Sequence, residues 1–345
     1  MTTNTEGAMN GAVFANLDEV EPRLAEQNYV SDRKLATVVF LATRLNKPIL
    51  AEGPAGVGKT ELAMSLARAL DRALIRLQCY EGLDEAKALY EWEYSKQLLY
   101  TQVLREKIGE VLGPTEGLRE AAKVLRERED VFFSENFLVE RPILQAIRSE
   151  RPPVLLIDEI DRADEEFEAF LLEFLSDYQV SIPEVGTVRA EHRPVVILTS
   201  NRTRELSEAL KRRCLHLQID YPGEEVELEI LRLKAPGMDE ELLEELVGTI
   251  QELRTLDLRK APSIGETIDW AQSLVVLNAP HLTKELIEET IGVIAKYERD
   301  ADKMLAHLGV GGPGEKRVGQ KEPTGENPAE AMYEYRRRPG AHARR

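Results

Sequence analysis

The sequence has few cysteines, few aromatic residues and no long apolar segment. Only two of its 345 residues are cysteine, Cys79 and Cys214. Their isolated positions lack the paired spacing of a zinc knuckle or a disulfide framework and indicate a reducing compartment, so we expect a cytoplasmic protein. No run of 18 apolar residues occurs, and residues 1–30 lack the charged and then apolar pattern of a signal peptide. We therefore expect no association with a membrane.

Positive charge is also scarce. Lys and Arg number 45 against 62 Asp and Glu, which gives a formal net charge of −17. Proteins that bind nucleic acid normally present a basic surface, so this balance argues against a nucleic-acid partner. The exception is the C-terminal segment, which is rich in Gly and Pro and contains two arginine clusters (336–338 and 344–345). This composition predicts a disordered, solubilising tail rather than a nucleic-acid-binding arm.

Strand and helix patterns alternate through the first two thirds of the chain. Short apolar runs at 49–52, 154–157 and 195–199 predict strands, and helical periodicity lies between them. This alternation predicts an α/β fold with a parallel sheet and helices on both of its faces. A hairpin is expected over 180–190. After Pro222–Gly223 the pattern is helical only, in four segments: 224–234, 239–256, 263–277 and 283–308.

A glycine-rich loop lies between the first predicted strand and the next helix. Residues 53–60 read GPAGVGKT, which fits the pattern G-x-x-x-x-G-K-[ST]. Glycines let successive backbone N–H groups surround phosphates, and the helix N-terminus favours their negative charge. Lys59 is expected to neutralise the β- and γ-phosphates, and the Thr60 hydroxyl to complete a magnesium shell. The sequence therefore predicts an ATP·Mg²⁺ site that includes Gly53, Pro54, Ala55, Gly56, Val57, Gly58, Lys59, Thr60 and Glu61.

Two later strands end in polar residues. The run VLLIDE (154–159) places Asp158 at the carboxyl edge of the sheet, where it can hold magnesium, and Glu159 beside it to polarise a water molecule. A glutamate at that position favours hydrolysis over transfer to a metabolite. The acidic residues that continue this run, such as Asp161, are interpreted as a solvated face. Asn201 follows the strand 195–199 and is expected to contact the γ-phosphate or the attacking water.

These motifs, in this order, resemble AAA+ ATPases of the MoxR family. The resemblance covers about 31–308 and rests on GPAGVGKT (53–60), LLIDEIDRADEEFEAFLLEFLSD (155–177), VSIPEVGTVRA (180–190), ILTSN (197–201) and EALKRRCLHLQIDYP (208–222). Residues 77–102 resemble the CoxD-type members, which are linked to maturation of carbon monoxide dehydrogenase. The resemblance implies an N-terminal extension, partly disordered (1–30), an AAA+ nucleotide-binding domain (31–222), a small all-α lid domain (223–308) and a disordered basic tail (309–345).

The resemblance also implies a role for individual residues. Lys59 and Thr60 match the Walker A pair, Asp158 and Glu159 the Walker B pair, and Asn201 matches sensor 1. Arg213 matches the arginine finger that reaches into a neighbouring subunit, with Arg212 as the alternative, so a homo-oligomeric ring, typically a hexamer, is implied. A sensor 2 arginine has no matching position, and Arg259 is only the nearest candidate.

Partners follow from the resemblance alone. The family usually works beside a protein with a von Willebrand factor A domain, and this subtype implies a client metallo-enzyme whose cofactor is inserted or activated. Two other functions stay open: an AAA+ ATPase that acts on nucleic acid, and an ATP-dependent switch with little turnover. The aromatic cluster of Tyr90, Trp92, Tyr94 and Tyr100 is interpreted as a packing patch or as a client-binding loop. The five histidines show no metal-ligand spacing, so no transition metal is expected.

Overall fold

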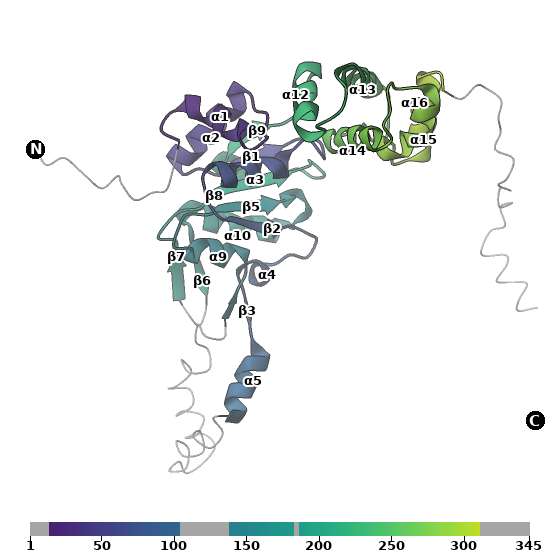
Figure 1. Ribbon diagram of the computed structural model, residues 1–345. Helices are drawn as coiled ribbons and strands as arrows, with labels where there is room; N and C mark the ends of the chain where they lie inside the picture. The colour runs from purple at the N-terminus through teal and green to yellow at the C-terminus, as the bar shows by residue number, and fades with distance from the viewer. Residues whose placement is uncertain (1–13, 104–137, 183–185, 311–345) are drawn as a thin grey trace, which may run out of the picture.

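The computed structural model describes residues 14–103, 138–182 and 186–310. In this part of the chain the main sheet has five parallel strands in the order β2-β5-β8-β1-β9 (Figure 1). Their bounds are β1 Ile49–Glu52, β2 Leu74–Gln78, β5 Val154–Asp158, β8 Val195–Ser200 and β9 Leu215–Gln218. The strand order differs from the chain order because helices cross over between strands. The predicted parallel α/β fold is confirmed.

Both faces of this sheet are covered. Along β5, Leu155 and Ile157 belong to one apolar cluster, whereas Val154 and Leu156 belong to the other, as expected when successive side chains point to opposite faces. The first face packs against α4 (Glu85–Leu89), α9 (Pro142–Arg148), α10 (Glu165–Asp177) and α11 (Glu208–Arg213). The second packs against α1 (Val20–Ala25), α2 (Arg33–Leu45) and α3 (Lys59–Ala69). Burial on two sides explains why the central strands are continuous apolar runs.

The segment before residue 31 is part of this fold. The 3₁₀ turn η1 (Leu17–Glu19) leads into α1, and the side chains of Phe14, Val20 and Leu24 are fully buried in the cluster of the second face. Folded structure therefore begins within the expected N-terminal extension (1–30), which was predicted to be partly disordered. The pattern was too short to reveal this at the level of sequence, because α1 has six residues and only two of them are buried. Residues 1–13 lie outside the described residues, as does the tail from 311.

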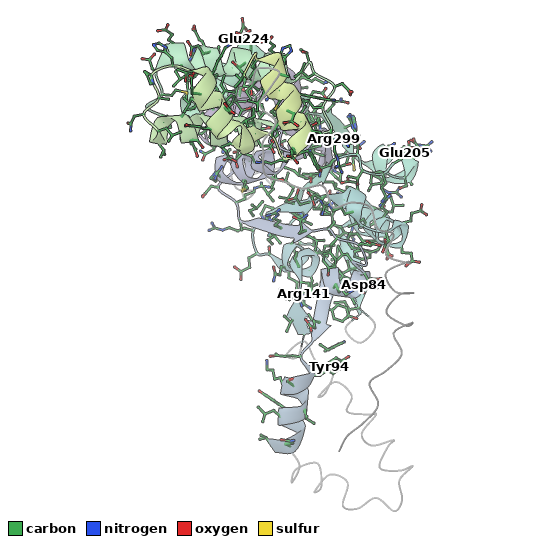
Figure 2. The ribbon with its side chains drawn as sticks, turned by 90° about the vertical axis from the view of Figure 1, so that its right-hand side faces the viewer. Asp84, Tyr94, Arg141, Glu205, Glu224 and Arg299 are labelled. Atoms are coloured by element: carbon green, nitrogen blue, oxygen red, sulfur yellow. The ribbon has the colours of Figure 1, made fainter. Side chains whose placement is uncertain are left out.

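A narrow arm extends away from the sheet. It consists of the antiparallel pair β3 (Tyr90–Trp92) and β4 (Leu138–Glu140) and of α5 (Tyr94–Val103) (Figures 1 and 2). Figure 2 shows Tyr94 where α5 begins and Arg141 at the base of the arm, and Arg141 forms an ion pair with Glu91 across it. The sequence pattern of 137–149 predicts a helix, but residues 138–140 pair with β3 and the helix begins at Pro142. The sequence pattern also predicts a helix over 118–128, a range that lies outside the described residues.

The aromatic residues of the arm fall into two groups. Tyr90 and Trp92 meet edge to face, with ring centroids 5.9 Å apart, and Tyr90 packs against the core below the sheet. Tyr94 and Tyr100 lie on α5 and are exposed, as are Leu98 and Leu99. The packing interpretation therefore suits the first pair, whereas the function of the exposed second group stays a hypothesis.

The hairpin and the helices after β5 follow the sequence closely. Strands β6 (Gln179–Ile182) and β7 (Gly186–Arg189) pair antiparallel, as predicted for 180–190. Helix α10 follows the 3₁₀ turn η3 (Ile160–Arg162), and α11 begins where the Ser207 side chain accepts a hydrogen bond from the Leu210 N–H. None of the helices in the described ranges is long and apolar enough to cross a bilayer.

The segment after Gly223 is helical, as expected, and has an apolar core of its own. Its helices are α12 (Glu224–Lys234), α13 (Glu240–Leu253), α14 (Ile264–Val276), α15 (Lys284–Ile294) and α16 (Glu298–His307). The fully buried Trp270 donates a hydrogen bond to the Thr290 hydroxyl at 2.8 Å. The single helix expected over 283–308 is two helices, because the backbone is extended at Ala295 and Tyr297. The break lets Asp300 accept hydrogen bonds from the backbone N–H groups of Arg259 and Lys260.

Candidate functional site

The glycine loop joins β1 to α3 at the carboxyl edge of the sheet. A Cβ atom on Gly53 would lie 1.8 Å from the Ile219 carbonyl oxygen, so no larger residue fits beside β9 there. Gly56 has φ of +76°, and a Cβ atom on it would lie 2.5 Å from the Ser263 side chain at the start of α14. The loop thus requires glycine for close approach as well as for backbone conformation. Its contact with Ser263 brings the C-terminal helices against the loop.

Lys59 is the first residue of α3 and is almost fully buried. Its Nζ donates hydrogen bonds to the carbonyl oxygens of Gly53 (2.8 Å) and Pro54 (2.6 Å). Burial lowers the pKa of the Lys59 ammonium, and the carboxylates of Asp161, Asp158 and Glu159 oppose that shift. The loop therefore holds a buried cation at a helix N-terminus, which is an environment suited to phosphate.

Asp158 is the last residue of β5 and is 3% exposed. Its carboxylate accepts hydrogen bonds from the hydroxyls of Thr199 (2.6 Å) and Thr60 (3.1 Å). It also forms an ion pair with Arg76 of β2 at 2.6 Å. The order of the strands explains why Arg76, Thr199 and Thr60 all reach Asp158. Strand β5 lies between β2 and β8, and it contacts α3. Paired carboxylate and hydroxyl oxygens are ligands that Mg²⁺ prefers, so Asp158 and Thr60 fit that ion.

Glu159 follows with φ of +57° and ψ of +51°, a left-handed conformation that is uncommon for a residue with a side chain. Its N–H donates to the Thr199 hydroxyl at 2.8 Å. Its carboxylate accepts hydrogen bonds from the side chains of Asn201 (3.3 Å) and Gln78 (3.1 Å), and it pairs with Arg162 at 3.0 Å. Strained backbone of this kind is a feature of functional sites, where the surroundings hold a side chain in one direction.

Asn201 follows β8, and Asp161 fixes its backbone. The prediction that Asp161 belongs to a solvated face is wrong, because the residue is only 3% exposed. Its carboxylate accepts hydrogen bonds from the N–H groups of Asn201 (3.2 Å) and Thr203 (2.9 Å) and from the Thr203 hydroxyl (2.6 Å). Burial alone would raise the pKa of the Asp161 carboxyl, but these hydrogen bonds outweigh it and lower that pKa. The exposed Glu165 and Glu166, by contrast, are at the surface as expected.

Replacing Asp161 by Asn tests this positioning role. The variant has one acceptor oxygen in place of two, so at least one buried donor loses its partner, and we expect a loss of about 1–3 kcal/mol in the free energy of unfolding. Because the folded-state pKa of Asp161 is low, its contribution to stability is present above the ordinary carboxyl pKa and is lost as the pH falls through the folded value. Urea denaturation at neutral and acidic pH measures both effects. Glu166→Gln, an exposed change in the same segment, is the control and should leave stability unchanged within about 0.5 kcal/mol.

Arg213 lies apart from the loop, at the end of α11. It is exposed, its Nε donates to the Ser176 hydroxyl at 3.0 Å and its guanidinium donates to the Ala209 carbonyl at 3.2 Å. Neither Arg213 nor the exposed Arg212 is among the residues that line the cavity over the loop. The structure therefore brings together Lys59, Thr60, Asp158, Glu159 and Asn201 but does not bring Arg213 to them.

A cavity of about 900 Å³ connects the loop to the C-terminal helices. Besides the loop and the acidic strand end, it is lined by Tyr29 from the N-terminal segment and by Ile264 and Ile268 of α14. This volume is in the range of small-molecule sites, which combine an apolar lining with a few polar groups. Lys234 of α12 also lines it and pairs with Glu61 at 3.5 Å, so a cation from the helical part faces the residue after Thr60.

Arg259 does not contribute to this cavity. Its guanidinium lies 4.0 Å from the centre of the Tyr297 ring, and it is not among the residues that line the cavity. Arg259 is therefore not placed to contact a ligand in this cavity, and the assignment of a sensor 2 residue stays open.

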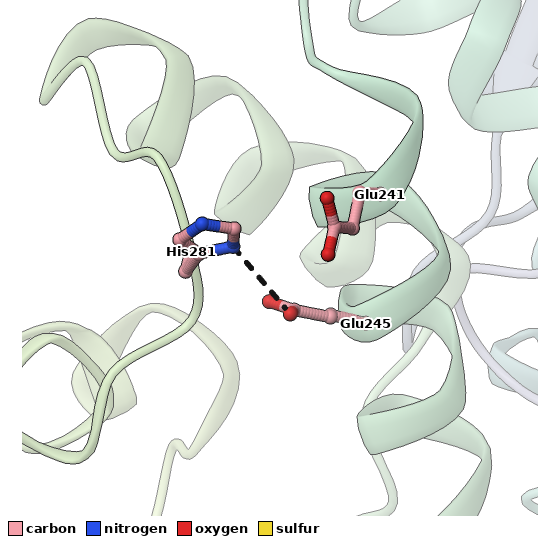
Figure 3. A group of neighbouring side chains, drawn as sticks. All are labelled: Glu241, Glu245 and His281. Carbon is pink, nitrogen blue, oxygen red and sulfur yellow. Dashed lines mark ion pairs between the residues drawn. The ribbon is translucent and has the colours of Figure 1, made fainter.

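A separate group of possible metal ligands lies on the surface of the helical part. Glu241, Glu245 and His281 have ligand atoms within 4.8 Å of one another (Figure 3). The sequence spacing did not reveal that His281 lies near two carboxylates. All three side chains are exposed, His281 pairs with Glu245 at 3.7 Å, and Glu245 accepts a hydrogen bond from the Leu282 N–H. These contacts join α13 to the loop before α15, and this structural role explains why the three side chains lie close together.

Sequence reasoning missed several residues of the site. Arg76 and Gln78, on β2, contact Asp158 and Glu159, and Thr199 bridges these two acidic residues. The alternation of Arg76 and Gln78 around the buried Leu77 was the available signal, because side chains two apart on a strand share a face.

Comparison with known proteins identifies the part of the chain that carries this site. Residues 48–214 match the family described as AAA domain (dynein-related subfamily). Uncharacterized proteins of Staphylococcus haemolyticus and Staphylococcus epidermidis are each 26% identical to the chain, over 68% of its length and 80% of theirs. Among solved structures, the RuvB Holliday junction branch migration motor of Thermotoga maritima aligns with a TM-score of 0.43 and 18% identity, over 81% of this chain and 76% of RuvB.

The matched segment contains the glycine loop, the acidic end of β5, the end of β8 and the helix that carries Arg213. It also contains four strands of the main sheet in full. The segment that carries the candidate site, residues 48–214, is therefore similar to the AAA domain of the dynein-related subfamily.

Proposed function

We propose that this protein hydrolyses ATP and uses the energy to remodel a partner protein, as the resemblance to MoxR ATPases implies. The observation that carries the proposal is the convergence of Lys59, Thr60, Asp158, Glu159 and Asn201 on one cavity at the carboxyl edge of a parallel sheet. Ligands of α/β sheets bind at this edge, and these residue types meet the needs of phosphoryl transfer to water.

The residues divide the chemistry among them. The loop N–H groups and Lys59 bind and neutralise the phosphates, while Thr60 and Asp158 hold Mg²⁺. When bound, Mg²⁺ supplies charge neutralisation on the β- and γ-phosphates. Glu159 accepts the proton of the attacking water, and the hydrogen bond from Asn201 Nδ2 orients the carboxylate for that task. The apolar end of the cavity, between Tyr29 and Ile264, suits a base.

The proposal extends to a homo-oligomeric ring, with six subunits as the family resemblance implies. Arg213 is exposed and lies outside the cavity of its own chain, so it can stabilise transition-state charge only in the site of a neighbouring copy. A head-to-tail arrangement that places α11 of one copy at the cavity of the next closes a ring. From the same family resemblance we also propose the domain organisation. The nucleotide-binding domain extends to residue 222, the lid domain extends to residue 308, and the tail follows.

The partners are proposed from the resemblance alone. They are a protein with a von Willebrand factor A domain and a client metallo-enzyme whose cofactor is inserted or activated, as in the CoxD-type members. The net charge of −17 argues against nucleic acid as the client.

Lys59→Ala tests the ATP site. Removal of this buried cation should weaken binding of ATP by about 10- to 100-fold, because the proposed phosphate contact is lost and a hydrogen bond to a charged group contributes about 1.5–3 kcal/mol. Titration of a fluorescent ATP analogue measures the affinity, and phosphate release measures turnover. Lys34→Ala, at an exposed lysine on the rim of the same cavity, is the control for loss of charge. Equal ATP affinity in the wild type and Lys59→Ala would contradict the proposal.

A further inference from the structure

Strand β2 lies at the edge of the sheet and places two polar side chains over the acidic end of β5. Arg76 pairs with Asp158 at 2.6 Å and also donates a hydrogen bond to the Gln78 side chain at 2.7 Å. Gln78 in turn donates to Glu159 at 3.1 Å. One continuous set of contacts therefore links Arg76 to both acidic residues of the site.

The two partners of the ion pair differ in exposure. The Asp158 side chain is 4% exposed, whereas the Arg76 side chain is 52% exposed. A buried carboxylate beside a second carboxylate needs compensating charge, and Arg76 supplies it from the solvent side. Because β2 is an edge strand and the Arg76 side chain is half exposed, the Arg76 guanidinium can move away from Asp158 without disturbing the core.

Arg76 also opposes any second cation at the same carboxylate. The Thr199 hydroxyl donates to Oδ1 of Asp158 and the guanidinium donates to Oδ2, while the Thr60 hydroxyl lies 3.1 Å from Oδ1 and 3.4 Å from Oδ2. A divalent ion held by Asp158 and Thr60 would lie near the guanidinium on the same carboxylate, and like charges repel at such short separation. The phosphates of a bound nucleotide would offset this repulsion, because they add negative charge on the other side of the ion.

We propose that Arg76 makes divalent-cation binding at Asp158 conditional on nucleotide, so that Mg²⁺ is held as the nucleotide complex and not as the free ion. This inference rests on the proposed ATP site and assigns Arg76 as a positioning residue that acts through Asp158. It predicts a change in the affinity for the free ion, which a merely structural ion pair would not produce.

The test is binding of free Mn²⁺, an ion with the same oxygen preference whose unbound fraction is measured by electron paramagnetic resonance. Arg76→Gln should bind free Mn²⁺ at least about tenfold more tightly than the wild type in the absence of nucleotide. Arg76→Lys keeps the charge and should match the wild type. Adding Asp158→Asn to Arg76→Gln should abolish the gain. Arg76→Met is a second neutral variant in case Arg76→Gln does not fold.

Two results would overturn the proposal. One is equal affinity for free Mn²⁺ in the wild type and a folded neutral variant. The other result needs no Arg76 variant. It is tight binding of free Mn²⁺ by the wild type, if the Asp158→Asn substitution abolishes that binding. The proposed function fails separately, if the wild type does not bind a non-hydrolysable ATP analogue in the presence of Mn²⁺. A wild type that binds the analogue while Arg76→Gln shows no change in free-ion affinity refutes only the inference about Arg76.

Discussion

Glu159→Gln should retain ATP and lose its hydrolysis. The carboxylate is held by Asn201, Gln78 and Arg162 at 3.0–3.3 Å, and the uncharged amide cannot accept a proton from water. Loss of a general base costs about 10²–10⁴-fold in turnover. The measurement is phosphate release under saturating ATP, together with the affinity for a fluorescent ATP analogue, which we expect to stay within about twofold of the wild type because Glu159 does not bind the phosphates.

The matched control is Glu166→Gln, which removes the same carboxylate from an exposed position seven residues later and should turn over ATP at the wild-type rate. Turnover by Glu159→Gln at the wild-type rate would indicate that the protein is a nucleotide switch or that another group activates water. The same variant provides a practical tool, because a chain that holds ATP without hydrolysing it should retain its client in a pull-down.

Arg213→Ala should reduce turnover by about 10³–10⁵-fold, the contribution of an arginine finger to transition-state stabilisation. In its own chain Arg213 is exposed and donates hydrogen bonds to the Ser176 hydroxyl and the Ala209 carbonyl, so its removal should cost little stability. Steady-state phosphate release and thermal unfolding measure the two effects. Arg212→Ala, its exposed neighbour on α11, separates the two candidates for the finger.

Mixing two inactive variants tests whether the finger acts between subunits. Arg213→Ala keeps an intact ATP site, and Lys59→Ala keeps an intact Arg213, so a ring that contains both should place a working finger at a working site. We expect turnover to reappear on mixing, to a maximum set by the fraction of productive neighbours. No recovery in mixed assemblies, or full turnover by Arg213→Ala alone, would contradict the proposed ring.

The fold could be predicted from the sequence because its signals are local. The apolar run before Asp158 and the glycines before Lys59 each define a strand end or a loop from a few consecutive residues. The capping box at Ser263 is another such case, since the Ser263 hydroxyl and the Glu266 carboxylate satisfy each other's backbone N–H groups as their spacing predicts. Where the signal was weak, the six residues of α1 were not predicted as a helix, and the break at Ala295 was missed.

The sequence by itself determined which residues are the candidates for phosphate chemistry, because the loop from Gly53 to Thr60 and the strand ends at Asp158 and Asn201 lie in short contiguous motifs. Only the tertiary structure decided what holds them in place. Arg76 lies 82 residues from Asp158 along the chain, and Asp161 binds Thr203 across 42 residues, yet both pairs are in direct contact. The reason is physical: parallel strands that are distant in the chain end at one edge of the sheet, and their register and not their spacing determines which side chains meet.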